Sequence, residues 1–246
     1  MALDWKLSPF PRIAPMSKLD TLDWTRIAAD LDARGHAVAA GLLTPAQCQA
    51  LAAGYDDEHR YRSRIVMSRH GFGRGEYKYF AYPLPRLLHN LRTALYPRLA
   101  PIANRWNRQM GIAVDYPDAH ADFLTRCHQA GQRRPTPLIL RYGPGDYNCL
   151  HQDLYGEHVF PLQVAVLLSR PDQDFSGGEF VMTETDSAGQ RAEVLPLRQG
   201  DALVFTVNQR PVAGARGWRR VAMRHGVSAL RDGQRHTLGV IFHDAT

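Results

Sequence analysis

The second half of the chain contains seven short apolar segments, which are separated by turn residues such as glycine, proline and aspartate. Short apolar runs between turn residues are typical of strands. Several strands at such close spacing predict a barrel or a double-sheet jelly roll. The segments are Leu138 to Tyr142, Cys149 to Asp153, Val159 to Ser169, Glu179 to Glu184, Ala202 to Val207, Val221 to Val227 and Arg235 to His243.

The first half is different, because from Leu22 to Gln129 its pattern is mainly helical. One helix should begin after Thr44, whose hydroxyl can cap it, with Pro45 at the first helical position and Gln47 completing a capping box. A second helical stretch runs from about Leu84 toward Met110, and its two internal prolines are candidate breaks.

No internal repeat, low-complexity tract or long Ser/Gly linker divides the chain. We therefore expect one domain over residues 1–246, with a mainly helical N-terminal elaboration in residues 1–134 and a jelly-roll catalytic core in residues 135–246. The predicted fold class is α+β, a double-stranded β-helix with the N-terminal helices packed against it.

The composition limits the classes of protein to which the chain can belong. A net charge of +6 and a pI near 9.4 favour phosphate-bearing or acidic partners. Three cysteines without a CxxC spacing argue against a disulfide framework and a thiolate zinc site. The apolar runs are too short to cross a bilayer, and early prolines interrupt any signal-peptide core, so we expect a cytoplasmic protein without a membrane partner.

Metal chemistry is indicated by the run His151-Gln152-Asp153. At the end of a strand, side chains at positions i and i+2 point to the same face, so the imidazole and the carboxylate can bind one metal ion. His225, 72 residues after Asp153, would complete three ligands. Two histidines and one carboxylate leave coordination positions open, which suits non-haem Fe(II) and oxygen chemistry rather than a closed structural zinc site.

Three other histidines, His158, His236 and His243, compete with His225 for the third position. No arginine follows His243, and strand alternation turns His236 away from Arg235. His225 is therefore preferred, and each of the other three can be an ordinary surface or core histidine.

Arg235, ten residues after His225, is the candidate for binding the far carboxylate of a 2-oxo acid co-substrate. If the two residues lie in one hairpin with a two-residue turn, Arg235 faces away from His225. A three-residue loop with Gly233 in the left-handed region instead pairs Arg235 with Ala229 and puts Arg235, Thr237 and His225 on one face. We predict the three-residue loop.

In order and type, these residues resemble the pattern of the 2-oxoglutarate- and Fe(II)-dependent oxygenases, which is HxD, a distal histidine and a C-terminal Arg-x-Ser/Thr. His151, Asp153, His225, Arg235 and Thr237 match it. The resemblance implies that the first three bind Fe(II), that Arg235 and Thr237 bind 2-oxoglutarate, and that dioxygen is consumed.

From about Arg141 to the C-terminus there is a closer resemblance, to bacterial oxygenases classed as acting on damaged DNA and related to AlkB-type dealkylating enzymes. It includes the run RYGPG at 141–145, and it implies that Tyr142 contacts the co-substrate. Two features depart from AlkB. Leu140 stands where AlkB has an asparagine, and the single Arg235 at its spacing from His225 is more similar to prolyl hydroxylases.

Tyr147 and Asn148 lie between Tyr142 and His151 in the sequence. We interpret both as candidates for lining the co-substrate pocket, with a structural role in the adjacent turn as the alternative.

Two segments suggest a nucleic-acid partner. Residues 59–82 interleave five arginines and one lysine with six aromatic residues, a mixture that suits phosphate neutralisation and base stacking. Three glycines in this segment would make part of it mobile, as a substrate lid should be; the alternative is a solvated surface whose aromatic side chains face the core. Residues 202–231 hold six arginines and no acidic residue, so we expect a positive field near His225.

The resemblance, together with the basic segments, implies an Fe(II)- and 2-oxoglutarate-dependent dioxygenase that oxidatively demethylates alkylated nucleic-acid bases. The spacing of Arg235 also fits a hydroxylase of a protein side chain or a small molecule. An alternative of another class is a non-catalytic jelly-roll module that binds a ligand or DNA, since the same scaffold carries many functions.

Overall fold

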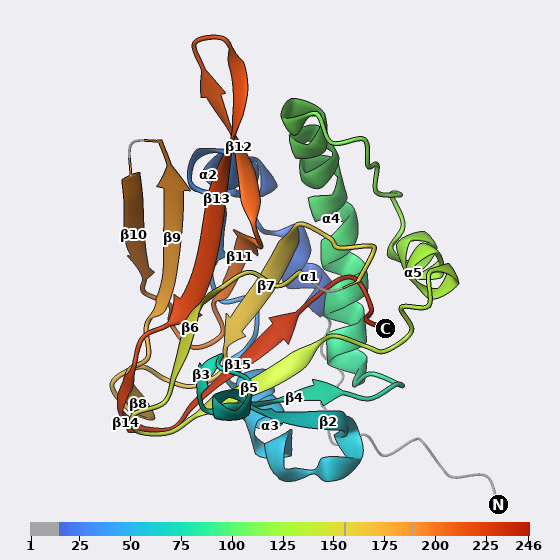
Figure 1. Cartoon of the computed structure of the whole chain (residues 1–246). Helices are drawn as coiled ribbons and strands as arrows, with labels where there is room; N and C mark the ends of the chain where they lie inside the picture. The colour runs from blue at the N-terminus through green and yellow to red at the C-terminus, as the bar shows by residue number, and fades with distance from the viewer. Residues whose placement is uncertain (1–14, 155, 188) are drawn as a thin grey trace, which may run out of the picture.

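Two antiparallel β-sheets face each other in the computed structural model, which describes residues 15–154, 156–187 and 189–246, and the helices pack against the larger sheet (Figure 1). The helices are α1 (Pro15–Asp20), α2 (Trp24–Arg34), α3 (Pro45–Ala53), α4 (Arg86–Met110) and α5 (His120–Gln129), with 3-10 turns at Gly54–Asp56, Glu58–Arg60 and Met67–Arg69. None of the described helices is long and apolar enough to span a bilayer.

Seven strands form the larger sheet, and every neighbouring pair in it is antiparallel. In spatial order they are β1 (His36–Ala39), β11 (Ala202–Thr206), β7 (Leu162–Leu167), β15 (Arg235–Val240), β5 (Leu138–Tyr142), β4 (Glu76–Phe80) and β2 (Tyr61–Val66).

The smaller sheet runs in the order β10 (Gly189–Leu195), β9 (Phe180–Asp186), β13 (Gly217–Val227), β6 (Tyr147–His151) and β3 (Gly73–Arg74), and β12 (Gln209–Gly214) pairs with the first half of β13. The β12–β13 hairpin projects beyond the rest of the molecule (Figure 1). A two-stranded ribbon of β8 (Phe175–Gly177) and β14 (Leu230–Gly233) lies where the chain passes from one sheet to the other.

Apolar residues fill two layers of core. The first layer lies between the helices and the outer face of the larger sheet, and it includes Leu31, Leu99, Val164 and Leu238. The second lies between the two sheets and includes Met182 and other residues of both inner faces. Burial on both faces explains why β7 and β11 read as almost continuous apolar runs in the sequence.

The predicted α+β jelly roll is confirmed, and all seven expected strand segments contain strands. The expectation that residues 22–129 are mainly helical is only partly right, because β1, β2 and β4 come from this half and belong to the larger sheet. The larger sheet therefore contains strands from both sides of residue 134, the boundary expected between the helical part and the jelly roll. In β4 the charged residues Glu76 and Lys78 alternate with Tyr77 and Tyr79, and a period of two is typical of strands.

Helix α4 continues through Pro97 and Pro101, although both were candidate breaks. A proline inside a helix removes one hydrogen bond and crowds the preceding turn. Burial of Leu95, Leu99 and other side chains of α4 in the first core layer offsets this loss, so the helix stays continuous over 25 residues.

Helix α3 begins as the sequence predicts. The Thr44 hydroxyl accepts a hydrogen bond from the Gln47 amide, and the Gln47 side chain accepts one from the Thr44 amide, so both halves of the capping box are present. Loss of an N-cap hydroxyl typically destabilises a protein by about 1 kcal/mol. Thr44→Ala should therefore lower the free energy of unfolding by about that amount in urea titrations, with an unchanged m-value. An unchanged midpoint would show that the cap contributes nothing.

Candidate metal centre and co-substrate pocket

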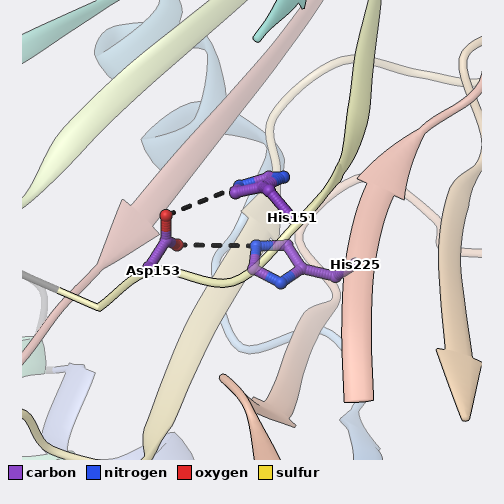
Figure 2. Close-up of side chains that lie close together, drawn as sticks. All are labelled: His151, Asp153 and His225. Carbon is purple, nitrogen blue, oxygen red and sulfur yellow. Dashed lines mark ion pairs between the residues drawn. The ribbon is translucent and has the colours of Figure 1, made fainter. Parts of the chain in front are cut away.

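His151, Asp153 and His225 converge between the two sheets. His151 ends β6 and lies directly opposite His225 of β13, while Asp153 follows two residues after His151. The Asp153 carboxylate points at both rings (Figure 2), with Oδ1 3.5 Å from His151 Nε2 and Oδ2 3.5 Å from His225 Nε2. One donor atom from each residue lies within 4.8 Å of the other two, which is the spacing of a site that can hold one metal ion.

Neighbouring groups fix the orientation of both imidazoles. His151 Nδ1 lies 2.7 Å from the carbonyl oxygen of Cys149, to which it donates when it carries the proton, and this leaves Nε2 directed at Asp153. The His225 ring stacks on Phe180 at 5.8 Å between centroids and contacts Phe205 at 4.7 Å. A ligand held in this way keeps its geometry without the metal.

The protonation states of Asp153 and His225 suit a cation. Burial alone would raise the pKa of the Asp153 carboxyl, but the two imidazoles hold that pKa well below its usual value. Burial would lower the pKa of His151, yet Asp153 and the Cys149 carbonyl raise it overall, whereas burial lowers the pKa of His225. At neutral pH Asp153 is therefore a carboxylate and His225 a neutral imidazole, which are the forms that bind metal.

A cavity of about 220 Å³ opens beside the three residues, and Arg235, Thr237, Tyr142 and Asn148 contribute to its wall. Arg235 is 2% exposed, and its Nη1 donates to Thr237 Oγ1 at 2.7 Å. Arg235 Nε and the Tyr142 hydroxyl are buried without a hydrogen-bond partner among the described residues. Burial lowers the pKa of Arg235 to about 10 and raises the pKa of Tyr142.

An anionic ligand would satisfy these groups. No carboxylate of the described residues lies within ion-pair distance of the Arg235 guanidinium. A buried guanidinium without a counter-charge is costly, and a bidentate carboxylate is the partner that matches it best. The cavity therefore offers three metal donors at one point and a carboxylate-binding cation at another.

Arg235 and His225 do share a pocket, but the predicted hairpin between them is wrong. β13 lies in the smaller sheet and β15 in the larger one, so Arg235 pairs with Tyr142 of β5 instead of with Ala229. Gly233 does adopt the left-handed conformation, with φ 80°, in the β14 ribbon. The two residues meet because the sheets face each other.

Strand alternation separates the two weaker candidates. Asn148 lines the cavity, whereas Tyr147 does not and is 38% exposed. The two are neighbours in β6 and so point to opposite sides. The prediction that Tyr147 lines the co-substrate pocket is therefore wrong.

His158, His236 and His243 take no part in the metal cluster found among the described residues. His236 points to the other face of β15, where its ring contacts Tyr55 at 5.5 Å, and His243 is completely buried. Of the four candidate histidines, His225 is the one that lies beside His151 and Asp153 in the described residues.

Residues of the basic segment 59–82 also line the cavity, which the sequence interpretation as a mobile lid did not anticipate. Tyr77 and Tyr79 project from β4, and Phe72 from the turn before it. Two of the three glycines serve close packing, because a Cβ atom on Gly73 would lie 2.4 Å from the Tyr147 carbonyl oxygen and one on Gly75 would lie 2.9 Å from the Tyr142 ring. The alternation of tyrosines in Glu-Tyr-Lys-Tyr-Phe is the signal that could have placed them.

Acidic residues of another strand neutralise part of the positive charge expected from the arginines of residues 202–231. Arg210 and Arg219 pair with Glu184 and Asp186 of β9, and Arg220 donates to the Met110 carbonyl. Local composition missed this neutralisation because the acidic partners come from another strand.

Comparison with known proteins identifies a family and a relative of this chain. The sequence model of one protein family, Oxygenase-NA, described as "Oxygenase, catalysing oxidative methylation of damaged DNA", matches residues 75–245. The uncharacterized protein Rv2227 of Mycobacterium tuberculosis is 49% identical over 167 residues, which cover 68% of this chain and 72% of that protein.

Solved structures share the fold at low sequence identity. A Pseudomonas putida prolyl-4-hydroxylase aligns with a TM-score of 0.54 and 15% identity, over 91% of this chain and 99% of that chain. An oxidoreductase of the 2OG-Fe(II) oxygenase family from Burkholderia pseudomallei aligns with a TM-score of 0.54 and 17% identity, over 91% of this chain and 92% of that chain.

Proposed function

Because the chain belongs to the Oxygenase-NA family and has the jelly-roll fold, it is an Fe(II)- and 2-oxoglutarate-dependent oxygenase, and we propose that it removes methyl groups from alkylated nucleic-acid bases. The family description names damaged DNA. Oxidation of an N-methyl group removes the methyl carbon, so the reaction that fits this site is demethylation.

His151, Asp153 and His225 are the proposed iron ligands. A set of two imidazoles and one carboxylate suits Fe(II) and would leave coordination positions for co-substrate and dioxygen. Iron, 2-oxoglutarate and dioxygen together supply the oxidation of a C–H bond, with succinate and carbon dioxide as co-products.

Arg235 is the proposed partner of the far carboxylate of 2-oxoglutarate. Its hydrogen bond to Thr237 fixes the guanidinium, and its unpartnered Nε and the Tyr142 hydroxyl are the donors left for the ligand. Burial of all three side chains excludes water from the ion pair and so strengthens it. Asn148 is a further candidate contact in the same wall.

Tyr142→Phe tests this assignment. Removal of a hydroxyl that donates to a carboxylate should raise KM for 2-oxoglutarate about 5- to 20-fold, while kcat changes little. Tyr96→Phe is a matched control. Tyr96 is equally buried and its hydroxyl also lacks a hydrogen-bond partner among the described residues, but it lies in the first core layer. An unchanged KM in Tyr142→Phe would remove Tyr142 from the co-substrate site.

Demethylation proceeds through hydroxylation of the methyl carbon. The resulting N–CH₂OH group then breaks at its C–N bond, which releases formaldehyde and returns a proton to the ring nitrogen. A base can reach a buried cavity only from a single strand or when it is flipped out of a duplex.

The observation that best supports a nucleic-acid substrate is the rim of the cavity. Phe72 lines it, is 42% exposed, and stacks with His70 at 5.5 Å and 21° between ring planes. Arg69 and Arg74 flank these two rings in the sequence, and both are exposed, with Arg74 Nε 4.0 Å from Asp146 Oδ1. Exposed rings between cations suit base stacking and phosphate contact.

The test measures succinate formation under four conditions. Three contain a methylated single-stranded oligonucleotide, the same oligonucleotide without the methyl group, or a proline-containing peptide, and the fourth contains no added substrate. We expect stimulation by the methylated strand alone, and stimulation that falls as salt rises, since phosphate contacts release counterions. Stimulation by the peptide and not by the methylated strand would favour a protein hydroxylase, the activity named for the Pseudomonas putida structure.

A further inference from the structure

Gln163 of β7 is a buried polar residue that the roles given above do not use. Its side chain is 4% exposed and lines the cavity, and its Nε2 has no hydrogen-bond partner among the described residues. A buried donor without an acceptor is unfavourable, and native structures rarely retain one without a reason. Gln163 therefore has a free N–H group next to the space where the reaction occurs.

The position of Gln163 excludes it from the co-substrate end of the cavity. Thr237 pairs with Leu167, and Gln163 lies four residues from Leu167 along β7, which is about 13 Å at the rise of a strand. Arg235 lies farther still in the same direction. A five-carbon acid that spans from Arg235 to the metal ligands does not extend to Gln163.

Gln163 is instead close to the proposed metal ligands, on the side away from Arg235. It pairs across the larger sheet with Phe205, whose ring contacts His225 at 4.7 Å between centroids. The opposite part of the wall carries Tyr77 and Tyr79, and the negative charge of Asp153 raises the pKa of both hydroxyls in addition to the effect of burial.

Small residues keep this part of the cavity open. Gly239 pairs with Ala165 on one side and with Leu138 on the other, and all three line the cavity. The Leu138 side chain covers Gly239, since a Cβ atom there would lie 3.0 Å from Leu138 Cδ1. A flat ring would therefore lie beside Leu138 and next to Ala165, with one edge toward Gln163.

We infer that Gln163 recognises the substrate by donating a hydrogen bond from Nε2 to a carbonyl oxygen on the methylated base. This inference rests on the proposed function. It selects bases in which a carbonyl neighbours the methylated ring nitrogen, of which 3-methylcytosine is one. It disfavours 1-methyladenine, because the carbons beside its methylated nitrogen carry a hydrogen and an amino group.

The experiment compares two single-stranded oligonucleotides of the same flanking sequence, one with a single 3-methylcytosine and one with a single 1-methyladenine. Repair is measured by mass spectrometry for the wild-type enzyme, Gln163→Met and Gln190→Met. Gln190 is an exposed glutamine of β10 and so provides the matched control. Succinate formation without nucleic acid shows whether each variant is folded and binds iron and 2-oxoglutarate.

The wild-type enzyme should repair 3-methylcytosine with a kcat/KM at least about 10-fold above that for 1-methyladenine. Gln163→Met should lose about 10- to 100-fold on 3-methylcytosine, retain its rate on 1-methyladenine, and keep the basal succinate rate. Gln190→Met should behave as the wild type.

Two results would overturn the inference. The first is equal repair of both bases by the wild-type enzyme, which counts against the inference even if Gln163→Met does not fold. The second is an equal loss on both bases in a folded Gln163→Met, which would show that Gln163 has a structural role. If the wild-type enzyme forms succinate but removes no methyl group from either strand, the proposed function itself fails, and this outcome is distinct from the first two.

Discussion

Replacing Asp153 with alanine is expected to abolish Fe(II)-dependent formation of succinate. Asp153 is the only carboxylate in the metal cluster of the described residues, and it holds both imidazoles at 3.5 Å. Without it the two histidines lack the charge that balances Fe(II) and the contact that orients them. Loss of a direct ligand should reduce turnover by more than about 100-fold, the upper end of what loss of a supporting residue causes.

Bound iron per protein, measured together with succinate, is the decisive readout for Asp153→Ala. Asp122→Ala provides the control, because Asp122 is an exposed aspartate on α5. Turnover in Asp153→Ala within a few-fold of the wild type would mean that the metal is held elsewhere.

The second large effect is expected at Arg235. Arg235→Leu removes a buried cation without an ion-pair partner in the described residues, and the carboxylate it is proposed to bind would enter an apolar site. Truncation of one partner of a buried charge pair commonly costs 2–5 kcal/mol or more, so KM for 2-oxoglutarate should rise by at least about 30-fold. Since the metal ligands are unchanged, iron content should stay the same.

Arg235→Lys separates charge from geometry. Lysine restores the charge but not the bidentate fork, so it should recover only part of the affinity for 2-oxoglutarate. Arg231→Leu is the control, because Arg231 is an exposed arginine four residues earlier. Its Nη2 lies 3.7 Å from Glu179 Oε1. If KM in Arg235→Leu equals that of the wild type, the co-substrate does not use this cation.

Local patterns predicted the parts of the structure that depend on neighbouring residues. The capping box at Thr44 and the exact bounds of β5 follow from residues within a few positions. The metal cluster was also predictable, because His151 and Asp153 are two residues apart at the end of one strand and a third ligand is required by coordination chemistry.

Pairing between residues far apart in the sequence accounts for the errors in the sequence-based predictions. The segment between His225 and Arg235 contains a turn with Gly233 in the left-handed conformation, which fits a hairpin locally. No local signal shows that β14 pairs with β8 and that β13 and β15 lie in different sheets. The neutralisation of Arg210 by Glu184 is hidden for the same reason.

The arrangement of strands also decides which residues reach the cavity. Tyr79 and Gln163 lie far apart in the sequence, and only the order β7-β15-β5-β4 brings them to one wall. Strands β4, β5 and β15 contribute alternate residues, and in β6 Tyr147 is excluded although its neighbour Asn148 is included.

The most direct test of the central claim is the stoichiometry of one reaction. Purified enzyme with Fe(II), 2-oxoglutarate and air is given a methylated single-stranded oligonucleotide, and succinate, formaldehyde and the restored base are counted together. After subtraction of the succinate formed without nucleic acid, we predict equal amounts of the three products, with none of them formed by Asp153→Ala. Succinate without formaldehyde or restored base would keep the oxygenase and contradict its assignment to nucleic-acid demethylation.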